Sequence, residues 1–235
     1  MRLPPLSVLC LHGYSQDAMV LRSQLKRMTQ RLEPRARFHF LDAPFTVPSV
    51  VDPSKEGCSW WLPSKDEAGN WNYGGVEESL RIVSEANKAE KSRSGNGFSG
   101  VLGFSQGGAL ASLLVALRES PEPAPLPDLR FAMFAGAFRY RAATPSYDYL
   151  FDGREELTTP SLHCIGARDT IIKGATSEAL EACFAAERRT SCRHNGGHVV
   201  PTGTPSLDVF DAFLEAQQKS ALASLAAEWS NGSYC

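Results

Sequence analysis

The sequence predicts an α/β fold, a single domain in which helices flank a mostly parallel sheet of about six strands. Three observations carry this prediction. Short apolar runs of strand length alternate with longer segments of helical periodicity along most of the chain. Hydrophobic residues make up 43% and charged residues 21%, the balance of a globular chain with a well-filled core. Finally, a length of 235 residues favours one domain over two.

The strands and helices follow from these runs in chain order. We interpret as strands the apolar runs at 7–11, 38–42, 100–104, 131–135, 161–165 and 190–193. The helical segments lie at 17–32, 76–89, 106–119, 176–186 and 207–216, and the last reaches 229 in its longest interpretation. In the second helix, Val76, Leu80 and Val83 are spaced as one buried face. We expect one domain over 1–235, with a core at about 5–216 and a C-terminal helical extension at 217–235.

Charge and cysteine content narrow the classes of partner. The formal net charge of −2 gives no basis for binding nucleic acid or an anionic membrane surface. No apolar run approaches the roughly 18 residues that span a bilayer, and the run at 6–11 is interpreted as a strand, not a signal peptide. Cys10, Cys164 and Cys192 lie in strand-like runs, where a thiol is a small hydrophobe. We therefore expect no stable membrane insertion and a cytoplasmic location.

A candidate nucleophile lies between the third strand and the third helix. Gly103-Phe-Ser105-Gln-Gly107 fits G-x-S-x-G, in which a serine occupies a strained strand-to-helix turn and the glycines allow close backbone approach. The pattern is short and occurs by chance in many chains. Its position after a buried-strand run and before a helix rich in Ala and Leu is what favours the nucleophile interpretation over an ordinary turn serine.

A nucleophilic serine needs a base and a carboxylate that orients the base. In α/β-hydrolase folds the chain order is Ser, acid, His. Of the downstream histidines, His163 falls inside a strand and His194 at a strand end, whereas His198 follows Gly-Gly in a loop that can reach the top of the sheet. We predict His198 as the base. Asp169, just beyond a strand end, is the predicted acid.

Three other aspartates fit the acid position less well. They are Asp148 and Asp152, in the irregular segment 138–159, and Asp208, which lies beyond His198 and so in the wrong order. A purely structural ion pair remains the alternative for Asp169.

Acyl transfer also requires donors for the developing oxyanion. The backbone N–H of Gln106 is one predicted donor, and the N–H of Tyr14, in the loop after the first strand, is the other. His12 is then expected to shape that loop.

The segment 44–75 is a long excursion from the strand–helix rhythm, and its aromatic residues suggest that it packs over the core. We expect Trp60, Trp61 and Tyr73 near the mouth of an apolar acyl pocket. The alternative, that the rings only anchor the loop, stays open. No large cap domain is evident, so the cap is predicted to be minimal.

Two rival motifs predict cofactors or metals and are rejected. The segment 95–100, Gly-Asn-Gly-Phe-Ser-Gly, matches G-x-G-x-x-G but follows a helix and precedes a strand, the reverse of a dinucleotide site. Cys192, His194 and His198 have a spacing that resembles part of a metal site, but no second ligand cluster accompanies them. We predict no cofactor and no metal.

With these residues assembled, the chain resembles the FSH family of serine hydrolases, which includes esterases related to the ovarian-cancer-associated hydrolase and fungal thioesterases. In the first half of the chain the matching segments are Leu-His-Gly-Tyr at 11–14, Asp-Ala-Pro at 42–44, Ser-Trp-Trp at 59–61 and Tyr-Gly-Gly at 73–75. Further along they are Gly-Phe-Ser-Gln-Gly-Gly at 103–108, Gly-Ala-Arg-Asp at 166–169 and His-x-Gly-Gly-His-x-x-Pro at 194–201. The resemblance implies Ser105, Asp169 and His198 as the triad, and carboxylesterase or acyl-thioesterase activity without a cofactor.

The sequence thus predicts a serine hydrolase that cleaves carboxylic esters or thioesters through an acyl-serine intermediate. The expected partner is a small-molecule substrate with an apolar acyl chain; the oligomeric state is left open. One alternative is a dedicated thioesterase that releases chains from a carrier protein or coenzyme A. A peptidase or lipase of the same fold is another, and a non-catalytic α/β-hydrolase that binds a ligand is the third.

Overall fold

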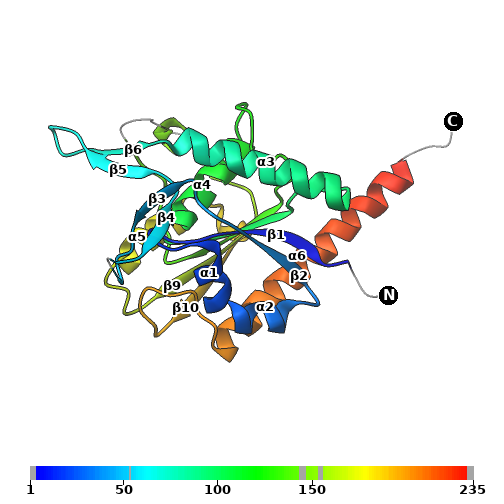
Figure 1. Cartoon of the computed structure of the whole chain (residues 1–235). Helices are drawn as coiled ribbons and strands as arrows, with labels where there is room; N and C mark the ends of the chain where they lie inside the picture. Colours follow the sequence, from blue (N-terminus) through cyan, green and yellow to red (C-terminus); the bar gives the residue numbers. More distant parts are fainter. Residues whose placement is uncertain (1–3, 53, 143–146, 153–155, 232–235) are drawn as a thin grey trace.

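A single six-stranded sheet organises the molecule (Figure 1). The computed structural model describes residues 4–52, 54–142, 147–152 and 156–231. Every strand pairing in this sheet is parallel, in the order β10-β9-β8-β7-β1-β2. The strands are β1 (Leu6–Leu11), β2 (Ala36–Leu41), β7 (Gly100–Phe104), β8 (Phe131–Ala135), β9 (Ser161–Gly166) and β10 (Arg189–His194). All six predicted strands are confirmed, with ends shifted by at most two residues.

Helices cover both faces of the sheet and bury two separate apolar clusters. On one face lie α1 (Ala18–Gln24), α2 (Lys26–Leu32) and α6 (Thr204–Asn231), and on the other α3 (Val76–Ser94), α4 (Gln106–Arg118) and α5 (Gly174–Glu181) (Figure 1). The central helix α4 is buried over nearly its whole length, from Gln106 to Leu117. The predicted fold class, a mostly parallel sheet flanked by helices, is therefore confirmed.

Several helix boundaries differ from the prediction for local reasons. The segment predicted as one helix at 17–32 is two helices, because Leu25 leaves helical geometry at φ −91° and ψ 5°. The last helix runs without a break through the predicted boundary at 216/217. Gln218 within it is buried, and its Nε2 donates to the carbonyl of Pro4 at 3.0 Å. None of the helices in the described part of the chain is both long and apolar enough to cross a membrane.

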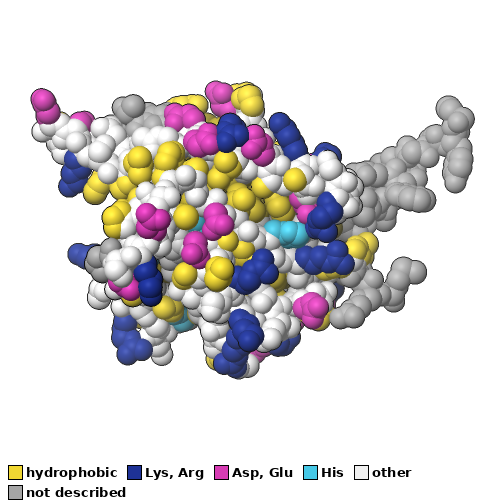
Figure 2. Space-filling model, viewed as in Figure 1, with side chains coloured by type: hydrophobic (Ala, Val, Ile, Leu, Met, Phe, Trp, Pro, Cys, Tyr) yellow, Lys and Arg dark blue, Asp and Glu magenta, His cyan; other side chains and the backbone are white. Residues whose placement is uncertain are grey.

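The excursion at 44–75 folds into two hairpins, which no sequence pattern predicted. The strands are β3 (Phe45–Pro48) with β4 (Glu56–Ser59), and β5 (Leu62–Lys65) with β6 (Trp71–Gly74). Each strand has only four residues, too few for a clear alternation of apolar and polar positions. Figure 2 shows hydrophobic side chains gathered over the part of the surface where the first hairpin lies.

The second excursion, 138–159, contributes a short 3₁₀ helix at Asp148–Leu150. Part of this segment, 143–146 and 153–155, lies outside the described residues. Among the described residues, the two hairpins, this helix and a second 3₁₀ helix at Ala186–Arg188 are the only elements beyond the sheet and its flanking helices. They form no large cap, in agreement with the sequence-based expectation.

Replacing Phe131 by alanine tests the core beneath β8. Phe131 is fully buried, and its ring contacts Gly100 of the next strand so closely that a Cβ there would be 2.2 Å from the ring. We expect Phe131→Ala to lower the free energy of unfolding by about 3–5 kcal/mol in urea titrations, because the cavity cannot fill. Met19→Ala, at a position 77% exposed, serves as control and should change it by less than about 0.5 kcal/mol. A similar loss in both variants would contradict this packing.

Candidate active site

Ser105 occupies a strained turn between β7 and α4. It is one of two non-glycine residues with positive φ among those described, at φ 53° and ψ −117°. Its backbone N–H donates to the Ala135 carbonyl at 3.0 Å, which joins the turn to β8. A Cβ at Gly103 would lie 2.4 Å from the Gly107 carbonyl oxygen, and one at Gly107 would lie 2.3 Å from that of Leu11. The two glycines of the motif are therefore required for close backbone approach.

The predicted acid and base meet at the carboxyl edge of the sheet. Asp169 follows β9 and His198 follows β10, and Nδ1 of His198 is 2.7 Å from Oδ2 of Asp169. The other carboxylate oxygen accepts the backbone N–H groups of Ile171 at 2.9 Å and Ile172 at 2.8 Å. Asp169 is only 8% exposed, so these three contacts hold its carboxylate in one orientation. A carboxylate so placed can fix the tautomer of the imidazole.

His198 lies beside the nucleophile turn. Its ring centroid is 4.8 Å from that of Phe104, the residue before Ser105. Gly136, at φ +50°, makes room for the imidazole, because a Cβ there would be 2.9 Å from Nδ1. Ser105 and His198 line one cavity, although no hydrogen bond joins them among the described residues. Contacts of this kind are often loose in free enzymes and tighten when substrate binds.

The two histidines rejected as the base, His163 and His194, contact other groups than Asp169. His163 is buried in the sheet, stacks on Phe134 at 4.9 Å and has its Nε2 3.0 Å from the Ser161 hydroxyl. Burial lowers the pKa of His163 to about 3, so this imidazole is neutral at ordinary pH. His194 ends β10, and its Nδ1 accepts the N–H of Gly196 at 3.2 Å.

Of the rejected aspartates, Asp152 pairs with Arg139 at 2.6 Å, and Asp208 lies in α6 near Arg31. Neither contacts His198. Asp148 lines a cavity that Ser105 also lines.

The loop after β1 holds one predicted oxyanion donor. Tyr14, in this loop, borders the same cavity as Ser105, while Gln106 is the first residue of α4. His12 is fully buried: its Nδ1 is 2.8 Å from the Gly13 carbonyl, and its Nε2 accepts the N–H of Ala43 at 3.1 Å. Burial lowers the pKa of His12, which keeps the ring neutral. His12 thus shapes the loop, as the sequence predicted.

The Gln106 side chain ties the aromatic excursion to the nucleophile turn. Its Oε1 accepts the backbone N–H of Trp60 at 3.0 Å. The indole N–H of Trp60 donates to the His12 carbonyl at 2.8 Å, and the Ser79 hydroxyl donates to the Trp60 carbonyl. Nothing in the sequence pattern indicated this role for the Gln106 side chain, because the motif leaves that position open.

The three aromatic residues predicted at the pocket mouth divide into two groups. Trp61 and Tyr73 stack with ring centroids 4.6 Å apart, and both line a cavity next to Ser105. Trp60 is fully buried by the contacts just described and is not among the lining residues. The expectation for Trp60 is corrected: it anchors the loop, which was the alternative interpretation.

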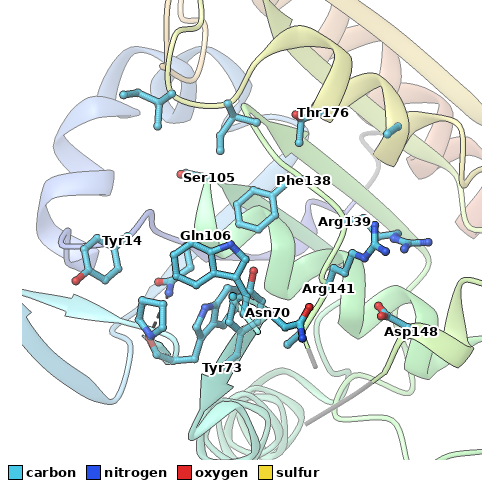
Figure 3. Close-up of a pocket in the computed structure, with 18 residues that line it drawn as sticks. Tyr14, Asn70, Tyr73, Ser105, Gln106, Phe138, Arg139, Arg141, Asp148 and Thr176 are labelled. Atoms are coloured by element: carbon cyan, nitrogen blue, oxygen red, sulfur yellow. Dashed lines mark hydrogen bonds between the residues drawn. The ribbon is translucent and has the colours of Figure 1, made fainter. Parts of the chain in front are cut away.

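Two cavities meet at Ser105. The larger has a volume of about 1120 Å³ and includes Trp61, Trp71, Tyr73 and Phe138 in its wall (Figure 3). The smaller, of about 700 Å³, is bordered by His198 and by apolar side chains that include Val50, Val51, Val199 and Pro201. Of the described residues, only Tyr14, Ser105 and Ile171 line both. A group held at Ser105 can therefore extend in two directions.

Comparison with known proteins decides the family. The model of the FSH1 serine hydrolase family matches residues 1–210. The chain belongs to this family. It is also 31% identical to the esterase OVCA2 of Danio rerio over 238 residues, which covers 91% of this chain and 98% of that protein. This FSH1 family member is therefore a serine hydrolase of the carboxylesterase or thioesterase type, as the sequence predicted.

A second relative is much longer than this chain. A dihydrofolate reductase of Schizosaccharomyces pombe is 30% identical over 217 residues, which cover 84% of this chain but 44% of that protein. Its name describes a protein of which the present chain spans less than half, and no reductase activity is carried over.

The solved structures establish the fold. Acyl-protein thioesterase 2 of Zea mays superposes with a TM-score of 0.64, covering 92% of this chain and 95% of that one, at 17% identity. The FSH1 family member thus has the α/β-hydrolase fold. Among its described residues, no group of three or more His, Cys, Asp or Glu side chains is arranged to hold a metal ion.

Replacing Gln106 by alanine tests the link between the turn and the excursion. The variant leaves the buried Trp60 N–H without its acceptor but keeps the backbone N–H of residue 106. We expect a loss of about 1–3 kcal/mol in the free energy of unfolding, measured by urea titration. Gln30→Ala, at an exposed position of α2, should change it by less than about 0.5 kcal/mol. Equal stability of the Gln106 variant and the wild type would refute the link.

Proposed function

We propose that this chain hydrolyses carboxylic esters, with Ser105 as nucleophile, His198 as general base and acid, and Asp169 as the group that orients His198. The observation that carries the proposal is the His198–Asp169 pair at 2.7 Å, beside a serine in the strained turn of a nucleophile elbow. The backbone N–H groups of Gln106 and Tyr14 are the proposed oxyanion donors.

The reaction takes two steps. Ser105 Oγ bonds to the carbonyl carbon while its proton passes to Nε2 of His198, and the Asp169 carboxylate stabilises the resulting imidazolium. The C–O bond to the alcohol then breaks, and His198 returns the proton to the departing oxygen. In the second step water gives a proton to His198 while its oxygen bonds to the acyl carbon. The bond between that carbon and Ser105 Oγ then breaks, His198 returns the proton to Oγ, and the acid is released. No atom outside the chain, the substrate and water is needed.

The position of His198 indicates which cavity holds the alcohol part of the ester and which holds the acyl chain. Because His198 must protonate the departing oxygen, the alcohol lies on its side of Ser105. Of the two cavities, only the smaller is bordered by His198, so we assign it to the alcohol. The acyl chain then extends into the larger cavity, along Trp61 and Tyr73. This assignment favours a small-molecule ester with a largely apolar acyl chain.

The lining of the smaller cavity favours an ester over a coenzyme A thioester. Coenzyme A carries phosphate groups, which proteins bind with Arg, Lys or helix N-termini. The described residues that line the smaller cavity include neither Arg nor Lys. Its apolar side chains suit an uncharged alcohol instead. A dedicated thioesterase for coenzyme A or a carrier protein is the second candidate, and a purely ligand-binding protein is the third.

Ser105→Ala tests the nucleophile. We expect kcat for p-nitrophenyl esters to fall by at least about 10⁴-fold, because the acyl intermediate can no longer form on residue 105. The melting temperature should not fall, which shows that the loss is chemical. A fluorophosphonate probe should label the wild type and not the variant. Hydrolysis by the folded variant at wild-type rate would refute the assignment, and absence of labelling in the wild type would favour a binding protein.

Asp169→Asn tests the orienting carboxylate. An amide presents its NH₂ or its carbonyl where Oδ2 now accepts from His198, so the imidazole loses its fixed tautomer. We expect kcat for the same esters to drop by roughly 10³- to 10⁴-fold, with a much smaller change in KM. Asp208→Asn, at an exposed position of α6, is the matched control. If kcat of the Asp169 variant fell by less than about tenfold, the His198–Asp169 pair would have only a structural role.

A further inference from the structure

The larger cavity is not apolar throughout. Figure 3 shows Arg139, Arg141 and Asp148 on the side of this cavity away from Tyr14. Tyr14 and Ser105 mark the junction with the smaller cavity. The charged side chains therefore lie at the far end of the proposed acyl site, beyond the aromatic wall. An acyl chain long enough to pass Trp61 and Tyr73 would reach them.

One of the two arginines is already engaged. Arg139 donates to Asp152 at 2.6 Å, and its guanidinium lies 5.4 Å from the centre of the Phe151 ring. Arg141, by contrast, is exposed at the cavity wall. None of the described residues accepts a hydrogen bond from its guanidinium or forms an ion pair with it. Within the described part of the chain, its five N–H donors have no partner and can meet a ligand.

Asp148 also lacks a partner among the described residues for one carboxylate oxygen, and that oxygen is buried, whereas Arg141 is exposed to solvent. Oδ1 of Asp148 is shielded from solvent, yet it accepts no hydrogen bond within the part of the chain that the structure describes. An ionised carboxylate oxygen in such a place loses hydration without compensation. The Asp148 carboxylate also acts on Tyr73. Burial, and to a smaller extent the negative charge of Asp148, raise the pKa of the Tyr73 phenol. A donor on a ligand would offset the cost.

Only some chemical groups suit a free guanidinium and a free carboxylate together. A guanidinium only donates hydrogen bonds, and an ionised carboxylate only accepts them. A terminal carboxylate on the substrate would be repelled by Asp148, and an ammonium by Arg141. A methyl end would desolvate both charged groups and pair with neither. A hydroxyl both donates and accepts, so it can satisfy the two side chains at once.

We propose that Arg141 and Asp148 form a specificity site that selects acyl chains carrying a hydroxyl group at their far end. This proposal rests on the proposed function, because it takes the larger cavity as the acyl site. The aromatic wall binds the methylene chain, and the polar end sets the preferred chain length. A hydrogen bond to a charged group corresponds to roughly 10- to 100-fold in kcat/KM.

The test uses three matched series of p-nitrophenyl esters of straight-chain acids, from about six to about twelve carbons, hydrolysed by the purified full chain. The series end in a methyl, a hydroxyl or a carboxylate. We expect one chain length at which kcat/KM for the hydroxyl-ended ester exceeds that for its methyl-ended partner by at least about tenfold. The carboxylate-ended ester should be the poorest of the three at that length.

Asp148→Asn and Arg141→Met assign the preference to these residues. Each variant should bring the hydroxyl-to-methyl ratio of kcat/KM at that length down to within about threefold of one. Arg37→Met is the control. Arg37 is exposed near the start of the edge strand β2 and does not line the larger cavity, so this variant should keep the wild-type ratio. The ratio is insensitive to the amount of folded enzyme, and either variant alone suffices if the other does not fold.

Three results would overturn the specificity site. These are a ratio near one at every chain length, a preference for the carboxylate-ended ester, or a hydroxyl preference that persists in both variants. In all three, methyl-ended esters are still hydrolysed and Ser105→Ala is still inactive, so the proposed function stands. If the wild type hydrolyses none of the esters, the proposed function fails and the specificity site fails with it.

Discussion

The conformation of Ser105 is the constraint on which the rest of the site depends. A non-glycine residue at positive φ costs of order 1–3 kcal/mol and persists only where its surroundings leave no alternative. Here β7 and the buried helix α4 fix both sides of the turn, and the N–H of Ser105 is bound to the end of β8. A side chain at Gly103 would collide with the start of α4, and one at Gly107 with the end of β1, so either would displace the turn. The strained turn is thereby held at the sheet edge where Asp169 and His198 also arrive.

Parallel strands explain why that meeting is possible. In this sheet every strand ends at the same edge, so loops after β1, β7, β9 and β10 converge although they are far apart in the sequence. The loop after β1 carries Tyr14, and those after β9 and β10 carry Asp169 and His198. The Gln106 side chain adds a second connection, from the turn to the loop of Trp60. The wall of the larger cavity is thus joined to the nucleophile by hydrogen bonds as well as by packing.

The sequence was sufficient for the inner strands of the sheet because β1, β7, β8 and β9 are buried runs, and burial on both faces leaves a clear signal. The edge strands β2 and β10 are only partly buried, and their signal is weaker. The choice of Asp169 and His198 followed from the rule that strand ends in a parallel sheet lie at one edge, and the structure places His198 Nδ1 2.7 Å from Asp169 Oδ2. The sequence did not predict the hairpins, whose four-residue strands are stabilised by contacts with distant segments, such as the pairing of Cys58 with Gln16. Nor could it separate Trp60 from Trp61, because the two are adjacent in the bend between β4 and β5, and only the fold decides which of them faces the cavity.

The two cavities differ in chemistry, and this difference gives the site a direction. The smaller has an uncharged lining beside the imidazole, while the wall of the larger passes from aromatic rings to charged side chains. A symmetric ester would thus meet two unlike environments, and only one orientation puts its departing oxygen within reach of His198. The opposite orientation would put the alcohol in the larger cavity and leave its oxygen without a proton donor, since of the two cavities His198 borders only the smaller. In the proposed mechanism, the placement of one imidazole therefore determines which half of the substrate each cavity can select.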